Sequence, residues 1–149
     1  MYIGNLQGAI LTALTADATL VSLTGHTGND PRIMLGFPNI KLAVYPCLCY
    51  TELSLNSVVK DGPTGLNETL INFVAFSKTL PTVTDIISRL KTLFDSNGVT
   101  QVNSFLDFSN SYICNRFTIF KSIGECDHDS DLDIYFQNIV AKVIWSDNY

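Results

Sequence analysis

The chain has 149 residues, the usual length of one domain, and it carries a net charge of −5. Its nine basic residues are scattered along the sequence, which excludes a basic stripe and therefore nucleic acid held through its phosphates. Charged residues make up only 15% and hydrophobic residues 46%, so we expect apolar surface that faces other subunits. The alternative is a well-filled core under a surface rich in Ser, Thr and Asn.

Two helices are predicted at the start of the chain. Apolar residues recur with the spacing of one helical face at Ile3, Leu6, Ile10 and Leu14. Asp17 is positioned to cap a short second helix, residues 18–23, and Gly25 to end it. His26 lies in the following loop without a Cys or Asp at ligand spacing, so a solvated side chain is expected.

Two strands and a long loop are predicted next. Residues 32–35 are interpreted as a short edge strand and residues 41–53 as a long central strand. Pro46 conflicts with a central position because proline has no backbone N–H to donate to a neighbouring strand. A bulge or an edge position is therefore expected there. Residues 54–68 are interpreted as a loop, and loops of this length are usually mobile or make contacts.

The middle of the chain has the strongest pattern. Residues 69–77 predict a strand with Phe73 and Ala75 on one face and Val74 and Phe76 on the other. A helix is predicted over residues 81–96, with Thr82 as its cap and Asp85 completing a start similar to a capping box. Its apolar stripe, which is expected to pack on the sheet, consists of Val83, Ile86, Ile87, Leu90, Leu93 and Phe94.

Strands dominate the last third of the chain. They are predicted at residues 99–105, 112–124 and 133–145, and the last two pair antiparallel around an acidic turn at residues 125–131. Alternation in the second of these strands places Ile113, Phe117, Ile119 and Ile123 on one side. The elements predict one α+β domain over residues 1–149, with an N-terminal helix and a mostly antiparallel sheet of four to five strands on which one central amphipathic helix packs.

The four cysteines are Cys47, Cys49, Cys114 and Cys126. Cys47 and Cys49 alternate on an extended segment, so both thiols point to one face, at a spacing unlike that of zinc or redox motifs. We expect buried, reduced thiols, with a disulfide or a metal site as the alternatives. The first basic residue is Arg32 and no apolar run approaches the roughly 20 residues that span a bilayer, so neither a secretory signal nor a membrane segment is expected.

Only the acidic turn has the residue types of a small-ligand site. Four aspartates alternate there as carboxylates do in calcium loops, at Asp127, Asp129, Asp131 and Asp133. Leu132 stands where the sharp turn of such a loop needs Gly, and Asn138 stands where a bidentate Glu is required. A solvated acidic hairpin tip is therefore favoured over a cation site.

No constellation has the pattern of a catalytic centre. Cys114 and Cys126 lack a local context that would pair them with His26 or His128 as nucleophile and base. The sequence contains no Gly-rich phosphate loop, serine elbow or zinc spacing. We therefore predict no enzymatic activity and no cofactor.

The order of elements resembles the tail completion, or tail terminator, proteins of long-tailed bacteriophages. Four segments carry the resemblance: residues 11–25, residues 32–33 with 46–48, residues 73–77 leading into 86–94, and the closing strands that end at residues 143–145. Two positions depart from the family pattern. Phe73 and Phe76 stand where the family often has Trp, and the turn before the last strand has Asp-His-Asp where Asp-Gly is common, which leaves the subgroup open.

The resemblance implies a structural virion protein. Such a protein forms a ring, commonly a hexamer, at the head-proximal end of the tail, where it caps the tail tube and joins it to the head connector. DNA passes through the lumen without specific binding, which suits an acidic chain because like charges repel. Residues 54–68, with Val58, Val59 and Lys60, are the candidate contact with the tube or connector, the alternative being a surface loop without a partner.

Two other functions remain open. A head–tail connector or stopper protein is close to the leading hypothesis and shares its class. A small cytosolic enzyme or ligand-binding α+β domain, with its pocket between helix and sheet, belongs to a different class. A ring-forming virion protein is expected to self-associate, whereas an enzyme can remain monomeric and is expected to lose activity on a single polar substitution.

Overall fold

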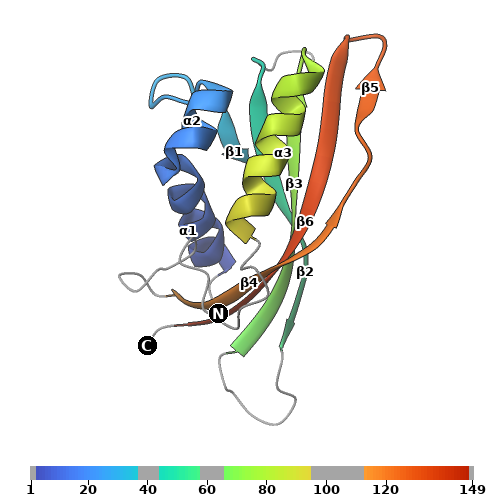
Figure 1. Ribbon diagram of the computed structural model, residues 1–149. Coiled ribbons are helices and arrows are strands. Elements are labelled where there is room, and N and C mark those ends of the chain that lie inside the picture. Colours follow the sequence, from blue (N-terminus) through green and yellow to red (C-terminus); the bar gives the residue numbers. More distant parts are fainter. Residues whose placement is uncertain (1–2, 37–43, 58–65, 95–112, 148–149) are drawn as a thin grey trace.

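The computed structural model describes residues 3–36, 44–57, 66–94 and 113–147. Three helices, α1 (Ile3–Ala16), α2 (Ala18–Thr24) and α3 (Leu80–Phe94), cover one face of a sheet (Figure 1). The strands in these ranges are β1 (Ile33–Leu35), β2 (Cys47–Ser57), β3 (Leu66–Ser77), β4 (Ile113–Ile123), β5 (Asp127–Asp129) and β6 (Ile134–Asp147). In the described ranges, none of the helices is long and apolar enough to cross a membrane.

The strand order is β1-β2-β3-β6-β4, and the short β5 pairs with β6. β1 and β2 run parallel, and all the other neighbouring strands run antiparallel. The predicted α+β fold is confirmed. The described sheet has six strands, more than the four to five expected, because part of the acidic segment pairs with β6 as β5.

The two N-terminal helices form as predicted. Ile10 and Leu14, on the predicted apolar face of α1, are buried. Asp17 caps α2 by accepting a hydrogen bond from the backbone N–H of Leu20 at 3.0 Å. Gly25 ends α2 with φ of 73°, a left-handed conformation that glycine adopts without strain. Both capping predictions are confirmed.

The strand β2 begins after Pro46 and does not run through it. It was predicted over residues 41–53, but it starts at Cys47 and continues to Ser57, and residues 41–43 lie outside the described ranges. Because Pro46 precedes the ladder, its missing N–H removes no hydrogen bond from the sheet, so the bulge or edge position expected for it was wrong. The edge strand β1 is confirmed, with Ile33 opposite Leu48.

The loop predicted over residues 54–68 is strand at both of its ends. Ser57 pairs with Asn67, so β2 and β3 form a longer hairpin than the side chains indicated. Strands pair through backbone hydrogen bonds, which form whether the side chains are polar or apolar. The pattern of side chains therefore did not predict the extended pairing. A register shift between Glu52 and Ser54 leaves the intervening residue as a bulge.

The helix α3 begins earlier than predicted. It starts at Leu80, so Thr82 lies inside the first turn and its expected role as the cap was wrong. The turn before the helix is fixed by Ser77, whose hydroxyl oxygen accepts a hydrogen bond from the N–H of Thr79 at 3.2 Å. The apolar stripe is confirmed for five of its six residues, since Val83, Ile86, Ile87 and Leu90 are buried and Leu93 packs against the same cluster. The side chain of Phe94 lies outside the described residues.

The last strand, β6, lies between β3 and β4 and pairs antiparallel with both, which confirms the predicted pairing of the final two strands. The ladder between β4 and β6 shifts register between Asn115 and Phe117 and again between Phe120 and Ser122. The uninterrupted alternation predicted for β4 was therefore wrong, because each shift inserts an extra residue into the strand. The strand predicted at residues 99–105 lies outside the described ranges.

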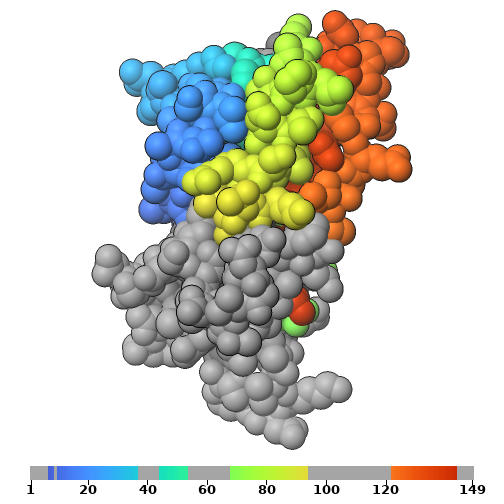
Figure 2. All heavy atoms as spheres, in the orientation of Figure 1, coloured from blue at the N-terminus to red at the C-terminus, as the bar shows by residue number. Residues whose placement is uncertain are grey.

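The main core lies between the helices and the sheet. Its strand residues include Leu48, Tyr50, Phe73, Ala75 and Ile139, which pack against the buried stripe of α3 and the inner faces of α1 and α2. The two faces predicted for β3 are confirmed, because its odd-numbered residues belong to this core and the even-numbered ones to the opposite face. Figure 2 shows the helices and the β5–β6 hairpin packed along the near side of the molecule.

An ion pair joins α3 to the start of α2. The Arg89 guanidinium donates to both carboxylate oxygens of Asp17, from Nη2 at 2.6 Å and from Nε at 3.1 Å. The Asp17 side chain is 11% exposed and that of Arg89 is 32% exposed. The hydrogen bonds from Arg89 hold the pKa of Asp17 below its ordinary value, since they stabilise the carboxylate form.

A second contact ties α1 to β2. The Tyr50 hydroxyl donates a hydrogen bond to the backbone carbonyl of Gln7 at 2.9 Å, and burial raises the pKa of Tyr50 to about 12. The Gln7 amide donates to Glu52 at 3.4 Å, and burial raises the pKa of that carboxyl. These bonds fix the position of α1 on the sheet.

Candidate assembly surface

The face of the sheet opposite the helices carries a second apolar cluster. Its buried members are Cys47, Cys49, Val74, Phe76 and Ile134, and Met34, Tyr45, Leu132 and Phe136 pack against them. Strand alternation produces this cluster, because the neighbours of these residues point into the main core. All three described helices lie on the other face (Figure 1).

The β5–β6 hairpin borders this second face. Its tight turn is held by Asp129, whose Oδ1 accepts hydrogen bonds from the N–H of Asp131 at 3.0 Å and of Leu132 at 3.2 Å. Asp133 has φ of 52°, a left-handed conformation that a short polar residue tolerates. His128 Nε2 lies 2.9 Å from Asp133 Oδ1. The segment predicted as an acidic turn is therefore a short strand followed by a tight turn.

The aspartates of this hairpin do not converge on a common point. In the part of the chain that the structure describes, no three His, Cys, Asp or Glu side chains are grouped to hold a metal ion. Asp127 and Asp129 instead accept hydrogen bonds from nearby backbone N–H groups. These contacts are those of a structured hairpin tip.

An open depression of about 430 Å³ lies between β3 and the β5–β6 hairpin, and we term it the hairpin groove. Its apolar lining consists of Val74, Phe76, Ile134 and Phe136. The register places Asp127 opposite Phe136 and Asp129 opposite Ile134, so both carboxylates stand on the groove face of the sheet. Glu125 also lines the groove. The result is an apolar floor beside three carboxylates.

Sequence analysis singled out the aspartates but missed the groove. Its floor comes partly from β3, which lies far from the hairpin in the sequence and reaches it only through pairing with β6. The local signal was the alternation of acidic residues, and it was interpreted as a solvated hairpin tip in preference to a cation loop. The hairpin contributes Ile134 and Phe136 to the apolar lining, but no pattern within it reports Val74 and Phe76 of β3.

Large apolar side chains are exposed around the sheet and at the start of α3. Their exposed fractions are 49% for Leu35, 55% for Val44, 55% for Leu53, 43% for Leu80 and 38% for Ile123. Leu35 belongs to β1 and Ile123 to β4, which are the outermost strands at opposite ends of the strand order. Apolar surface is thus present at both edges of the sheet.

The two thiols of β2 are buried and free, as predicted. The hydrogen bond that Cys49 donates to Cys47 lowers the pKa of Cys47, and the same bond, with burial, raises the pKa of Cys49. Cys126 is exposed, contrary to the expectation of burial. Partial desolvation and the neighbouring Asp127 carboxylate raise the pKa of Cys126. The side chain of Cys114 lies outside the described residues.

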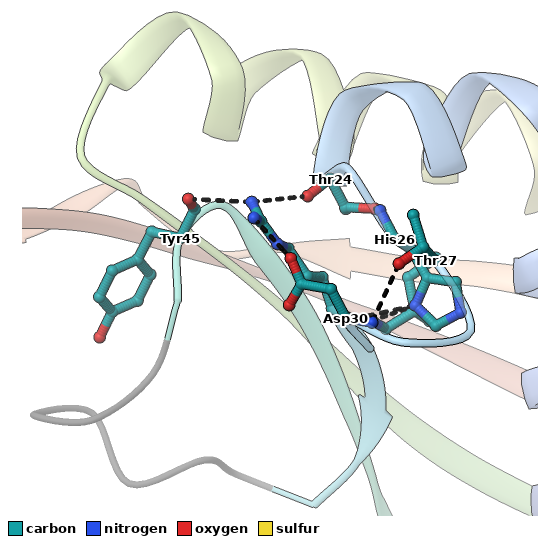
Figure 3. A network of polar contacts seen from close by, with 7 residues as sticks. Thr24, His26, Thr27, Asp30 and Tyr45 are labelled. Carbon is teal, nitrogen blue, oxygen red and sulfur yellow. Dashed lines mark hydrogen bonds and ion pairs between the residues drawn. The ribbon is translucent and has the colours of Figure 1, made fainter.

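His26 organises the loop after α2 and is not simply solvated. Its Nδ1 accepts hydrogen bonds from the backbone N–H of Arg32 at 2.9 Å and of the next residue at 3.1 Å. The Arg32 guanidinium pairs with Asp30 at 2.8 Å and donates to the carbonyls of Thr24 and Tyr45 (Figure 3). The solvated role expected for His26 was wrong, because folding brings the backbone N–H groups of Arg32 and of the first residue of β1 against its ring.

The two histidines considered as catalytic bases have other contacts. His26 accepts backbone hydrogen bonds, and His128 pairs with Asp133 and lies 4.5 Å from the Tyr135 ring, centroid to centroid.

The region between α3 and the sheet, where a ligand-binding domain would have its pocket, is occupied by side chains of the main core. The residues predicted to contact a tail partner, Val58, Val59 and Lys60, lie outside the described ranges.

The fold is similar to that of a chain from the virion of a native gene transfer agent (GTA) particle. The similarity has a TM-score of 0.59 and covers 98% of this chain and 99% of that chain, at 14% sequence identity. No protein-family model and no curated protein matches the sequence. At this level of identity, the similarity establishes a shared fold.

Proposed function

We propose that this chain is a structural protein of a phage-like virion and that it assembles with copies of itself into a ring. The observation that carries the proposal is the similarity to a GTA virion chain over 98% of this chain and 99% of that one. The similarity extends over nearly the whole of both chains and is not confined to a local motif. A structural role also agrees with a helix–sheet interface that is filled by core side chains.

The surfaces support self-assembly. A ring of identical subunits needs head-to-tail contacts, in which two different patches of the chain meet. Leu35 at the β1 edge and Ile123 at the β4 edge place exposed apolar side chains at the two ends of the sheet. Such side chains stabilise a contact by leaving water, at roughly 25 cal/mol per Å² of apolar area buried.

The specific role that we propose is that of a tail terminator. The order of helices and strands agrees with the resemblance to tail terminator proteins described above. The ring would cap the tail tube at its head-proximal end and join it to the connector, with residues 58–60 in contact with one of these partners. The net charge of −5 per subunit suits a lumen through which DNA passes without adhering.

Measurement of mass in solution tests self-assembly. The wild-type chain is expected to form a species of several subunits, alone or in the presence of tail tubes, and the variants Leu35→Asp and Ile123→Asp are expected to dissociate it. Ser88→Asp is the matched control, because it adds the same charge at an exposed position on α3, away from both edges. Equal dissociation by all three variants would contradict the proposed edges, and a chain that stays monomeric in every condition would contradict the ring.

A further inference from the structure

The charge of the chain is concentrated beside the hairpin groove. Residues 125–133 contain five of the fourteen acidic residues and no Lys or Arg. The remaining nine acidic residues are matched by the nine basic residues, so the rest of the chain has no net charge. Glu125, Asp127 and Asp129, which belong to this segment, line the groove.

The floor of the groove is apolar and already shaped. Val74 and Phe76 are 6% and 5% exposed, and Ile134 is 1% exposed, so the floor is held by packing in the second cluster. The groove volume of about 430 Å³ lies in the range of about 300–1,000 Å³ in which pockets bind ligands. A large apolar side chain entering it loses contact with water while its backbone stays near the three carboxylates.

A second copy of this chain is a poor occupant on grounds of charge. Outside residues 125–133 it offers no net positive charge. Three of its basic side chains are already engaged within the chain, where Arg32 pairs with Asp30, Arg89 with Asp17, and Lys142 with Glu68. A second copy therefore brings no excess positive charge to the three carboxylates, and a basic segment of a different protein complements them better.

From this geometry we propose that the hairpin groove binds a segment of another protein, in which one large apolar side chain is flanked by Lys or Arg. The apolar side chain enters the floor formed by β3 and β6, and the basic side chains meet Glu125, Asp127 and Asp129. The apolar contact supplies affinity, and the carboxylates select a basic segment and speed its encounter. This inference does not rest on the ring, because the groove lies within one subunit.

The test uses the full chain and a labelled synthetic peptide with one phenylalanine between two pairs of lysines. Fluorescence anisotropy is expected to show saturable binding at low salt that weakens as salt is added. Replacing the phenylalanine with glycine is expected to weaken binding at least about tenfold. The variant E125Q/D127N is expected to weaken it about fivefold, whereas D85N/D131N, which removes the same charge from exposed sites outside the groove, changes it less than about twofold.

The outcomes separate this proposal from its competitors. The absence of saturable binding by the wild-type chain would overturn it, as would equal binding of the glycine peptide. Equal weakening by the two double variants would show general charge attraction and no groove. If E125Q/D127N instead reduces the mass of the self-assembled species, a second copy occupies the groove and the proposal is wrong. Thermal unfolding of each variant confirms that it is folded, and the peptide comparison on the wild-type chain does not depend on any variant.

Discussion

The contact between Asp17 and Arg89 gives a sharp test of how the helical layer is stabilised. The Asp17 carboxylate makes two interactions: it caps α2 by accepting from the N–H of Leu20, and it accepts two hydrogen bonds from the Arg89 guanidinium of α3. Asp17→Ala removes both the cap and the ion pair, whereas Asp17→Asn keeps an oxygen for the cap and removes the negative charge. The two variants therefore separate the cap from the ion pair.

The expected magnitudes follow from these contacts. Loss of the cap destabilises a protein by about 1 kcal/mol, and loss of charge-assisted hydrogen bonds by about 1.5–3 kcal/mol. Arg89 is 32% exposed, so water partly solvates the orphaned guanidinium and the lower end of that range applies. We expect Asp17→Ala to lower the free energy of unfolding by about 2–3 kcal/mol and Asp17→Asn by about 1.5 kcal/mol.

Urea and thermal unfolding measure these differences. For a chain of this length, 1 kcal/mol corresponds to about 2–4 °C in Tm, so Asp17→Ala is expected to lower Tm by about 5–10 °C. A double-mutant cycle of Asp17→Asn with Arg89→Met, which keeps the apolar stem of the side chain, isolates the coupling. Equal stability of Asp17→Asn and wild type would refute a contribution from the ion pair, and equal loss in Asn and Ala variants would refute one from the cap.

The same contact has a pH dependence of defined sign. The folded-state pKa of Asp17 is held below its ordinary value of 3.8, chiefly by the hydrogen bonds from Arg89. The stabilisation from the carboxylate is therefore fully present above pH 3.8 and is lost as pH falls through the lowered pKa. The difference in unfolding free energy between wild type and Asp17→Asn is expected to be constant from neutral pH down to that point and to shrink below it.

Three further predictions concern single side chains. His26→Ala is expected to lower the free energy of unfolding by about 1–2 kcal/mol because two backbone N–H groups lose their acceptor, while His26→Asn, which retains an acceptor, loses less in urea unfolding. In native protein, mass mapping after thiol labelling is expected to find Cys126 modified and both Cys47 and Cys49 protected, and labelling of the latter two at the rate of Cys126 would contradict their burial. Tyr50→Phe is expected to lower the free energy of unfolding by about 1 kcal/mol, and hence Tm by about 2–4 °C, because the hydrogen bond to the α1 carbonyl is lost, and an unchanged Tm would show that this bond adds nothing.

The parts of the fold that sequence predicted are those governed by local rules. The α3 stripe follows from helical spacing, the caps of α2 from Asp17 and Gly25, and the two faces of β3 from alternation. Each of these signals lies within one element. These signals can be read without knowing which elements pack against them in the fold.

The parts that sequence missed depend on pairing across the fold. The β2–β3 hairpin extends into a polar segment through backbone hydrogen bonds, and these bonds are not reflected in the polar and apolar alternation of the side chains. The register shifts of β4 and the acceptor role of His26 both depend on partners that folding brings near. The hairpin groove is the same case, since Val74 and Phe76 of its apolar floor come from β3, which is far in the sequence from the segment that supplies the carboxylates.

Electron microscopy of the protein mixed with tail tubes from its own particle tests the central claim most directly. The account predicts closed rings of identical subunits, seated at one end of each tube and absent from its sides. Tubes with bare ends beside a protein that stays monomeric, or protein bound along the tube walls, would contradict it.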